Sequence, residues 1–450
     1  MNPIRETIDY YHALLDPQTA ADTAGQLTEQ QRRRGLFFGD RPLCTVLRPR
    51  FLRTEEYRAI QTAVRSLMPA FARAHAAALA DADFRHQFRL SEWEEELVHV
   101  DPGFQAASPT ARMDTFFDEA SQLWCTEYNA ETPAAVAYND VLTEVFYALP
   151  VMREFEKTYD VRPLPGRHHM LHALIDSYRQ WGGAEKPRLA ILDWHEVPTY
   201  SEFVLFQDYF QAQGYECVIA DPRDVTYQNG KLYAAGFPVH IIYKRVLISE
   251  LVLRGGLDHP VIRAVRDRAV CMVNPFVCKI LHKKASLAVL SDEANSRLFT
   301  PAERQAIDRY IPWTRVVADR PTTYGGGNID LLAFLAKYKN EFVLKPNDEY
   351  GGKGIVLGWE VDQTEWEAAL RAALTEPTIV QKRVPLPKFP YASWVDERVA
   401  IYDRMLDTNP YIWYGAYASG CLTRLSTVSL LNVTAGGGST VPTFVVEKRL

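Results

Sequence analysis

The chain has 450 residues, of which 47% are hydrophobic and 24% charged, and its formal net charge is −6. This length predicts two or three subdomains, and this composition is typical of a soluble globular protein. No stretch approaches the roughly 20 apolar residues that span a bilayer, and a negative charge without a basic stripe argues against nucleic-acid partners. The N-terminus lacks the apolar core of a signal peptide, so we expect a cytoplasmic protein. Six cysteines without a CxxC spacing predict neither a zinc site nor a disulfide framework.

The N-terminal part of the chain is predicted to be mainly helical. Residues 55–81 carry Ala, Leu and Phe at i, i+3 and i+4 spacing, which is typical of an amphipathic helix. One strand is expected at residues 44–49. Residues 108–140 are polar and rich in aromatic side chains, which indicates a strand, a loop and a second strand. A further helical stretch is expected from residue 141 to residue 178.

After Gly182 the pattern changes to strands that alternate with helices. Strands are expected at residues 188–193, 216–221 and 240–243, and a helix is expected to start near Ser201. This alternation predicts a parallel sheet with both faces covered. Ligands bind such sheets at the carboxyl ends of the strands. The side chains at this predicted binding edge are Asp193, Glu196, Asp221, Lys244 and Arg245.

From residue 341 the sequence becomes rich in β-branched residues. One helix is expected over residues 363–374, and further strands are expected at residues 377–382, 397–402 and 442–446. Between residues 324 and 328 three consecutive glycines precede a helical pattern, and we interpret them as a flexible hinge.

A glycine-rich turn in this region is the most informative motif of the chain. An apolar run delivers Lys345, and Gly351-Gly352-Lys353-Gly354 follows a short polar segment. Glycine lets a backbone approach a polyphosphate closely, successive N–H groups in such a turn bind anions, and a lysine adds charge. The spacing differs from a Walker loop, and the strand that follows excludes a dinucleotide fingerprint. We interpret the segment as a hairpin that folds over phosphates; an ordinary β-hairpin is the alternative.

A second group of polar residues lies far upstream. Glu127 and Asn129 are two residues apart in an extended segment and therefore share a face, while Asp114 lies on the preceding predicted strand. Carboxylate and amide oxygens suit Mg²⁺, which shares them with substrate phosphates. The pattern predicts a magnesium site, and a solvated strand edge is the alternative.

These motifs resemble those of a known family. Residues 127–133 resemble the magnesium-binding segment of glutathionylspermidine synthetases (their synthetase domain) and related ATP-grasp ligases. Residues 342–352 resemble the phosphate loop of the same group, which includes eukaryotic-type glutathione synthetase, and residues 378–382 resemble the strand that lines the adenine. The candidate metal ligands precede the phosphate loop, as in the circularly permuted branch. The resemblance covers roughly residues 110–445 and implies an α/β, α+β fold of the permuted ATP-grasp type.

The resemblance implies a role for each matching residue. The implied metal ligands, for what we expect to be two Mg²⁺ ions, are Asp114, Glu127, Asn129 and Glu349. The implied ATP contacts are Lys284, Lys345, Gly351, Gly352, Gln381, Lys382 and Glu397, with Lys283 as an equally exposed competitor of Lys284. Arg112 and Arg424 are the expected catalytic residues, since both suit transition-state charge. The expected substrate contacts are Thr132, Glu202, Arg245 and, in a small-residue lid, Gly437; a surface ion pair is the alternative for Arg245 and a plain linker for the lid.

The resemblance also implies a division of the chain and a function. The predicted segments are a helical region (1–107), metal-binding strands and helix (108–180), a parallel-sheet substrate subdomain (181–330) and the nucleotide-binding hairpin, lid and C-terminal strands (331–450). We expect an ATP-dependent carboxylate–amine ligase that acts on small molecules through an acyl phosphate and releases ADP and phosphate. The alternatives are a nucleotide-binding protein without ligase activity and a small-molecule kinase. His168 and His172 have a spacing that could bind zinc, but without a third ligand we interpret them as an accidental cluster.

Overall fold

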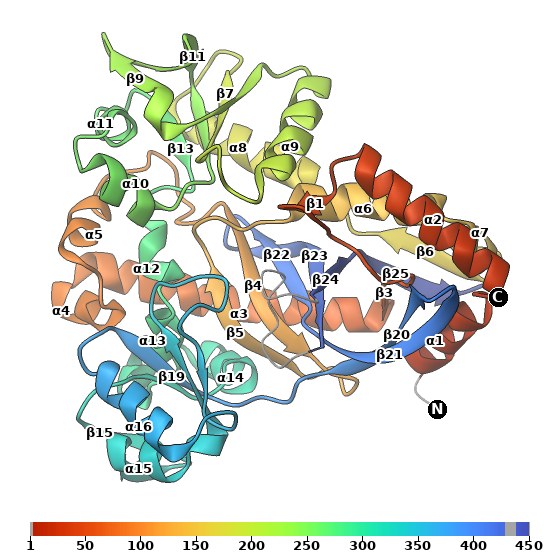
Figure 1. Cartoon of the computed structure of the whole chain (residues 1–450). Helices are drawn as coiled ribbons and strands as arrows, with labels where there is room; N and C mark the ends of the chain where they lie inside the picture. The colour runs from red at the N-terminus through yellow and green to blue at the C-terminus, as the bar shows by residue number, and fades with distance from the viewer. Residues whose placement is uncertain (1–2, 428–437, 450) are drawn as a thin grey trace.

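The computed structural model describes residues 3–427 and 438–449, and it shows a mixed α/β protein built around a central antiparallel sheet (Figure 1). A parallel sheet with its helices lies at one end, at the top of the view, and a smaller sheet that carries the glycine-rich hairpin lies at the lower left. The first two helices, α1 (Pro3–Ala13) and α2 (Pro17–Arg33), lie to the right of the central sheet (Figure 1). The α/β class and the parallel-sheet subdomain are therefore as the sequence predicted.

The central sheet has the strand order β20-β21-β23-β22-β4-β5, with β24 paired to β23. Its strands are β4 (Thr110–Phe117), β5 (Leu123–Asn129), β20 (Lys388–Val395), β21 (Arg398–Leu406), β22 (Asn409–Trp413), β23 (Tyr417–Ser426) and β24 (Ser439–Val441). Strand β4 pairs with both β5 and β22, so segments far apart in the sequence lie side by side. These pairings join two of the four segments into which the sequence was divided.

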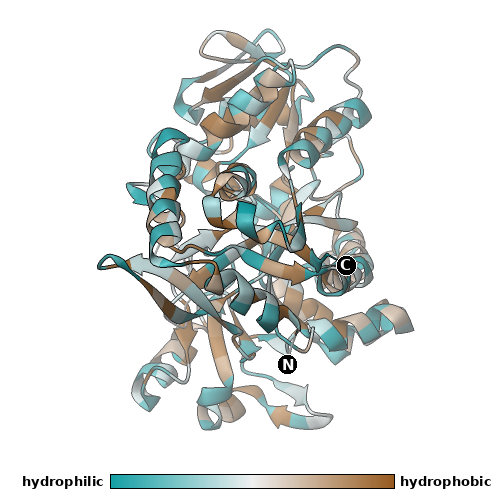
Figure 2. Cartoon of the chain, turned by 90° about the vertical axis from the view of Figure 1, so that its right-hand side faces the viewer, coloured by the Kyte–Doolittle hydropathy of each residue, from teal (hydrophilic) through white to brown (hydrophobic). Residues whose placement is uncertain are grey.

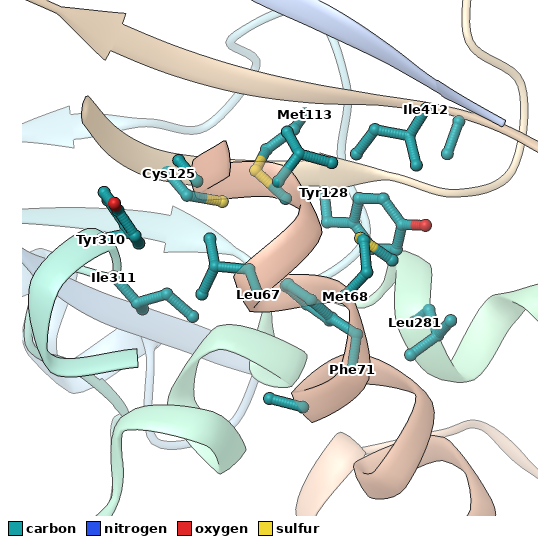
Figure 3. Close-up of a cluster of buried hydrophobic side chains, with 14 of the residues drawn as sticks. Leu67, Met68, Phe71, Met113, Cys125, Tyr128, Leu281, Tyr310, Ile311 and Ile412 are labelled. Atoms are coloured by element: carbon teal, nitrogen blue, oxygen red, sulfur yellow. The ribbon is translucent and has the colours of Figure 1, made fainter. Parts of the chain in front are cut away.

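One face of β4 and β5 packs on the long helix α3 (Thr54–Ala80), which corresponds to the helix expected at residues 55–81 within one residue at each end. The ring centroids of Phe71 and Tyr128 lie 4.7 Å apart in this core. Side chains alternate along a strand, so the opposite face of β4 and β5 remains available for polar residues. The apolar side chains that meet here include Leu67, Met68, Phe71, Met113, Cys125 and Tyr128 (Figure 3).

A second small sheet, of order β3-β25-β6, joins the two ends of the chain. Strand β3 (Arg50–Arg53) pairs with β25 (Thr443–Lys448), which also pairs with β6 (Tyr159–Pro163). The elements beside this sheet are α1 (Pro3–Ala13), α2 (Pro17–Arg33), α6 (Val136–Ala148), α7 (Pro150–Phe155), β1 (Phe37–Phe38) and β2 (Arg41–Pro42). Figure 2 shows hydrophilic and hydrophobic residues alternating along the outer helices. Within the described ranges, no helix combines the length and apolar character that crossing a membrane requires.

Two predicted elements of this region are wrong. The strand expected at residues 44–49 is instead β3. Cys44 N donates to Gln31 Oε1 rather than to a neighbouring strand, and Leu47 N donates to the carbonyl of Ala392. The helical stretch expected from residue 141 to residue 178 is divided by β6. Prolines at the starts and ends of these elements break the helical hydrogen bonding.

The parallel sheet has the order β13-β12-β7-β8, and the three strands expected from the sequence are present. Its elements are β7 (Leu189–Leu192), β8 (Cys217–Ala220), β12 (Ile241–Lys244), β13 (Cys271–Val273), α8 (Arg167–Trp181), α9 (Tyr200–Ala212), α10 (Ile248–Gly255) and α11 (Pro260–Arg266). The sequence did not predict the antiparallel sheet inserted after β8, formed by β9 (Val225–Gln228), β10 (Lys231–Ala234) and β11 (Phe237–Val239).

The hairpin lies in a sheet of order β14-β19-β17-β18. Its strands are β14 (Thr314–Val316), β17 (Phe342–Pro346), β18 (Val356–Leu357) and β19 (Thr378–Lys382), and the nearby elements are α4 (Ala82–Arg85), α5 (Glu92–Leu97), α12 (Cys278–His282), α13 (Ala285–Ser291), α14 (Pro301–Tyr310), α15 (Leu331–Lys337) and α16 (Gln363–Ala372). The hinge expected near residue 325 is instead a tight turn between β15 (Pro321–Tyr324) and β16 (Gly327–Asp330). Gly325 and Gly326 have φ of 57° and 81°, which a two-residue hairpin turn requires.

Candidate active site

Four polar side chains lie on the face of β4 and β5 that is turned away from α3. In the strand register Arg112 lies opposite Asn129, and Asp114 lies opposite Glu127. Residues directly opposite in an antiparallel pair share a face, as do residues two apart on one strand. The structure therefore brings together three of the four predicted metal ligands and one predicted catalytic arginine.

Asp114 is held by the two predicted catalytic arginines. Arg112 donates to its carboxylate from Nε at 2.7 Å and from Nη2 at 3.1 Å, and Arg424 donates from Nη2 at 2.7 Å. Arg424 also donates from Nε to Asp407 at 2.7 Å. Burial alone would raise the pKa of Asp114, but Arg112 and Arg424 hold it well below its ordinary value. Asp114 is thus an ionised carboxylate between two guanidinium groups.

Two lysines reach the same face from outside the central sheet. Lys284 Nζ lies 2.9 Å from Glu127 Oε1 and donates to the carbonyl of Glu349 at 2.6 Å. Lys345 Nζ donates to Gln381 Oε1 at 2.8 Å and to a backbone carbonyl of β5 at 3.2 Å. In the part of the chain that the structure describes, Lys345 forms no ion pair with a carboxylate. Burial lowers its pKa to about 8, although Glu127 opposes this change.

These charged groups carry a surplus of positive charge. We call them the strand cluster, whose members are Arg112, Asp114, Glu127, Lys284, Lys345, Asp407 and Arg424. Among these residues, four cations face three carboxylates, so a bound anion would balance the site. The amide Nδ2 of the neighbouring Asn129 is buried and has no hydrogen-bond partner among residues 3–427 and 438–449, which is a cost that a ligand would remove. The oxygen donors of Asp114, Glu127 and Asn129 are the type that Mg²⁺ prefers, so these residues fit the expected ion.

The glycine-rich turn follows β17 and leads into β18. Gly351 and Gly352 have φ of 65° and 78°, a conformation that glycine adopts without strain. A Cβ atom added at Gly354 would lie 2.7 Å from Pro346 Cγ, so the base of the turn also needs a glycine. The side chain of Glu349, the fourth predicted metal ligand, pairs with Lys353 at 3.1 Å. Only its backbone carbonyl reaches the strand cluster, through Lys284.

The predicted adenine and ribose contacts lie in different places. Gln381 on β19 accepts from Lys345 and donates to Thr314 Oγ1 at 3.1 Å, so its side chain orients the lysine. Lys382 lies at the exposed end of β19, with Nζ 5.6 Å from the centroid of the Tyr324 ring. Glu397 is not brought to this region. It occupies the turn between β20 and β21 with φ of 58°, and those strands pack against α2.

The predicted substrate residues border the loop that follows β5. Arg245 Nη1 donates to the carbonyl of Pro133 at 2.6 Å, and Arg112 Nη1 donates to the next carbonyl along the chain at 3.3 Å. Arg245 also lies 3.4 Å from Glu202 Oε2. Both groups are buried, so the alternative of a surface ion pair is wrong. Thr132 is half-buried on the same loop, whereas Gly437 lies outside the described residues.

The carboxyl edge of the parallel sheet divides into buried and solvated charges. Asp193 is buried after β7, and burial raises its pKa to about 6, with Arg245 opposing. Asp221 and Glu196 both pair with Arg223, at 2.6 and 2.7 Å. The edge predicted from the sequence therefore directs Asp193 and Arg245 inward and leaves Glu196 in an exposed ion pair.

The structure distinguishes the two candidate lysines of the following segment. Lys284 reaches the strand cluster, whereas Lys283 Nζ lies 2.7 Å from Glu94 Oε1 and 2.9 Å from Asp348 Oδ2. Both lysines are buried, so the expected exposure of Lys283 is wrong. Two consecutive residues thus serve two different groups of charges.

Sequence reasoning missed the second of these groups. Glu131, His282 and Asp348 place one ligand atom each within 4.8 Å of the others, the one such group of metal-ligand spacing in the described ranges. The predicted ligands and the histidines near residue 170 are not part of it. A signal was present in the sequence: Lys279 interrupts the apolar run from residue 276 to residue 281, and a buried lysine needs a partner.

Comparison with known proteins identifies the family of the chain. Residues 88–426 match the family described as circularly permuted ATP-grasp type 2, which confirms the permuted fold that the resemblance implied. Among solved structures, a glutathione synthetase-like effector from Globodera pallida in its apo form has a TM-score of 0.60 at 12% identity, covering 96% of this chain and 98% of its own. The search of curated proteins finds no match.

Two further solved structures share smaller parts of the chain. A RimK domain ATP-grasp protein from Sphaerobacter thermophilus DSM 20745 has a TM-score of 0.28 at 17% identity, covering 58% of this chain and 90% of its own. D-alanyl-alanine synthetase A from Vibrio cholerae O1 biovar eltor str. N16961 has a TM-score of 0.30 at 10% identity, covering 57% and 74%.

Proposed function

Since the chain belongs to the circularly permuted ATP-grasp type 2 family, we propose that it is an ADP-forming ligase that joins a carboxylate to an amine. The observation that carries this proposal is the surplus positive charge of the strand cluster beside three oxygen donors that suit Mg²⁺. ATP with bound magnesium supplies the negative charge that this arrangement lacks. Family membership supports ATP-dependent ligase activity in general, and the carboxylate–amine chemistry is the more specific part of the proposal.

The ATP phosphates would contact Lys345 and Lys284, whose positive charges both lower the pKa of Glu127. The backbone N–H groups of the turn at Gly351 and Gly352 would cover the phosphates. Gln381 holds Lys345 in place through its side-chain oxygen. At the end of the same strand, Lys382 would lie beside the adenine or ribose.

Magnesium would be held by Asp114, Glu127 and Asn129, and Glu349 would be a further ligand if its side chain left the pair with Lys353. When bound, it neutralises charge that develops on the transferred phosphoryl group. Arg112 and Arg424 meet at Asp114 and present planar, fixed donors beside it. Such preorganised donors stabilise a transition state without reorganising.

In the first step, an oxygen of the substrate carboxylate attacks the γ-phosphorus of ATP, and the bond to ADP breaks. In the second, the amine attacks the carbonyl carbon of the acyl phosphate, phosphate leaves with the bonding electrons, and the nitrogen loses a proton. The products are an amide, ADP and phosphate. The glycine-rich hairpin would exclude water, which would otherwise hydrolyse the acyl phosphate.

The acid substrate would lie between the strand cluster and the parallel sheet. Arg245, Glu202 and Thr132 border this region, and an arginine fork suits a second carboxylate of an amino acid or peptide. We therefore propose small-molecule acid and amine substrates.

The test is ADP release with Mg-ATP across a panel of amino acids, short peptides and amines, with products identified by mass. Ligation predicts ADP release that needs both substrates and a product lighter than their sum by one water. Glu127→Ala and Lys345→Ala are expected to abolish this turnover. Lys186→Ala, which removes a lysine at the amino-terminal edge of the parallel sheet, is the matched control and should leave it unchanged.

Other outcomes contradict the proposal in distinct ways. A stable phosphorylated product formed without an amine would identify a kinase. Tight magnesium-dependent ATP binding without turnover would indicate a nucleotide-binding protein. Unchanged turnover in both Glu127→Ala and Lys345→Ala would show that the site has been assigned wrongly.

A further inference from the structure

A second group of buried charges lies beneath the glycine-rich hairpin. We call it the anchor network, whose members are Glu94, Glu131, Lys244, Lys279, Lys283 and Asp348. They come from α5, the loop after β5, β12, α12, the segment before α13 and the segment after β17. The network therefore joins six elements and segments that lie between residues 94 and 348.

Lys279 occupies the centre of the network. Its Nζ lies 2.6 and 2.8 Å from the two carboxylate oxygens of Asp348, 3.1 Å from Glu131 Oε2 and 3.4 Å from Glu94 Oε1. The ammonium group therefore lies where a cation would sit among the acidic ligand atoms. Burial, with help from Lys279, lowers the pKa of the adjacent His282 to about 4, so this ring is neutral.

The anchor network is balanced without a bound ion. Within it three carboxylates face three ammonium groups, and every side chain except that of Asp348 is at most 6% exposed. Asp348 is 26% exposed and is the one member that the hairpin supplies. If the hairpin moved away, Lys279 and Lys283 would each lose one carboxylate partner, and two buried carboxylates would be left to compensate three ammonium groups.

The other end of the network reaches the parallel-sheet subdomain. Glu131 Oε1 accepts from the backbone N–H of Ile248, at the start of α10, at 2.6 Å. It also lies 3.4 Å from Lys244 Nζ, and Lys244 precedes Arg245 at the end of β12. A continuous chain of ionic contacts thus runs from the hairpin to the edge where the acid substrate would bind.

A second, weaker contact also connects the hairpin to the parallel-sheet subdomain. The hydroxyl of Tyr350 donates to Glu250 Oε1 at 3.4 Å, and Glu250 lies on α10. Glu250 also accepts from the Trp194 indole at 2.9 Å. Two neighbouring parts of the hairpin are therefore tied to the element that Glu131 caps.

We propose that Asp348 and Glu131, joined through Lys279, are positioning residues that hold the glycine-rich hairpin against the parallel-sheet subdomain. The contacts define where the hairpin stands before ATP binds, and they connect that position to the substrate edge. The placement itself stands on the contacts alone, whereas its consequence for ATP binding rests on the proposed function.

Limited trypsin digestion of the full chain tests the placement without any ligand. Lys353 lies in the turn, and its side chain is 77% exposed, so cleavage after it reports how often the hairpin detaches. Asp348→Asn removes a charged partner of two lysines, and we expect cleavage after Lys353 to be about tenfold faster. Asp348→Glu should restore most of the protection. Asp396→Asn, in the exposed turn between β20 and β21, is the matched control and should cleave like the wild type.

A paired substitution separates positioning from charge balance. Asp348→Asn combined with Lys283→Met restores equal numbers of buried charges, so we expect the melting temperature to recover toward that of the wild type. Cleavage after Lys353 should nevertheless remain fast, because the hairpin still lacks its carboxylate. If the double variant regains protection together with stability, Asp348 only balances charge and the proposal is wrong.

Binding of a non-hydrolysable ATP analogue with Mg²⁺ tests the consequence separately. We expect Asp348→Asn to weaken binding about tenfold, through the population of a competent hairpin, while Asp396→Asn binds like the wild type. If the wild type binds no nucleotide, the proposed function fails, but the digestion experiment still decides the placement. If the wild type binds and Asp348→Asn is indistinguishable from Asp396→Asn in digestion, the positioning proposal is overturned and the proposed function stands.

Discussion

Lys283 and Lys284 are neighbours in the sequence, yet they serve two clusters that are balanced in different ways. In the anchor network three carboxylates compensate three ammonium groups, and little of the network reaches solvent. In the strand cluster four cations face three carboxylates, and Lys345 contacts only neutral oxygens among the described residues. A balanced cluster supports the fold by itself, whereas an unbalanced one is prepared for a charged ligand.

This difference predicts opposite responses to the loss of one charge. Removing one partner of a buried ion pair leaves the other uncompensated, which is strongly unfavourable. Removing a surplus buried cation relieves a cost instead, because burial disfavours the charged form. Stability measurements on single variants can therefore show which cluster is structural.

Glu131→Gln is expected to give the largest effect. Lys279 and Lys244 would lose a buried carboxylate, and the free energy of unfolding should fall by about 3–5 kcal/mol. Urea unfolding measures this loss. The control is Glu154→Gln, which removes an exposed pair with Lys157 and should change stability by less than about 1 kcal/mol. Equal effects of the two substitutions would contradict the contrast between balanced and surplus charge.

Lys345→Met is expected to act in the opposite direction. The folded protein no longer carries a surplus ammonium group whose pKa is lowered from 10.5 to about 8. Below pH 8 the variant should therefore be more stable than the wild type by about 3 kcal/mol. It should also lose ATP binding, since Lys345 would contact the phosphates. Urea unfolding at pH 7 measures the first change and calorimetry the second. If Lys345→Met lost as much stability as Glu131→Gln, Lys345 would not be a surplus positive charge in the strand cluster.

The stability difference between the wild type and Lys345→Met should depend on pH, and the sign of this dependence follows from the pKa of Lys345. Burial lowers the pKa of Lys345 from 10.5 to about 8 in the folded protein, so between these values the unfolded chain binds more protons. Wild-type stability therefore rises with pH in this window relative to the variant. The advantage of Lys345→Met should be constant below pH 8 and should disappear by about pH 10.5. If the stability difference between the two proteins stayed constant from pH 8 to pH 10.5, the pKa of Lys345 in the folded protein would not be lowered.

Much of the strand cluster could be predicted from the sequence because it depends on patterns among residues that are close together in the chain. Alternation along a strand places Glu127 and Asn129 on one face, and the glycine-rich turn indicates the hairpin without knowledge of the rest of the fold. Glu397 shows the limit of this reasoning. A β-rich run does not reveal that its first residue forms a turn, so the expected ribose contact lies in another part of the fold.

The anchor network could not be predicted because it depends on tertiary contacts between distant parts of the chain. Glu131, Lys279 and Asp348 are separated by long stretches of sequence, and only the packing of α12 between the hairpin and the loop after β5 brings them together. A lysine within an apolar run signals that a buried partner exists but does not identify it. The pairing of β4 with β22 is unpredictable for the same reason, since strand partners are chosen by the whole fold.

The smallest predicted effect concerns the second tie of the hairpin. Tyr350→Phe removes one neutral donor, and the hydrogen bond to Glu250 is long and partly exposed. The free energy that holds the hairpin in place should therefore fall by about 0.5 kcal/mol. Cleavage after Lys353 should then rise by only about twofold. Tyr402→Phe, on an exposed strand face of β21, is the matched control and should not change the rate. An effect of Tyr350→Phe as large as that of Asp348→Asn would mean that the hydroxyl contact, rather than the ionic chain through Lys279, holds the hairpin in place.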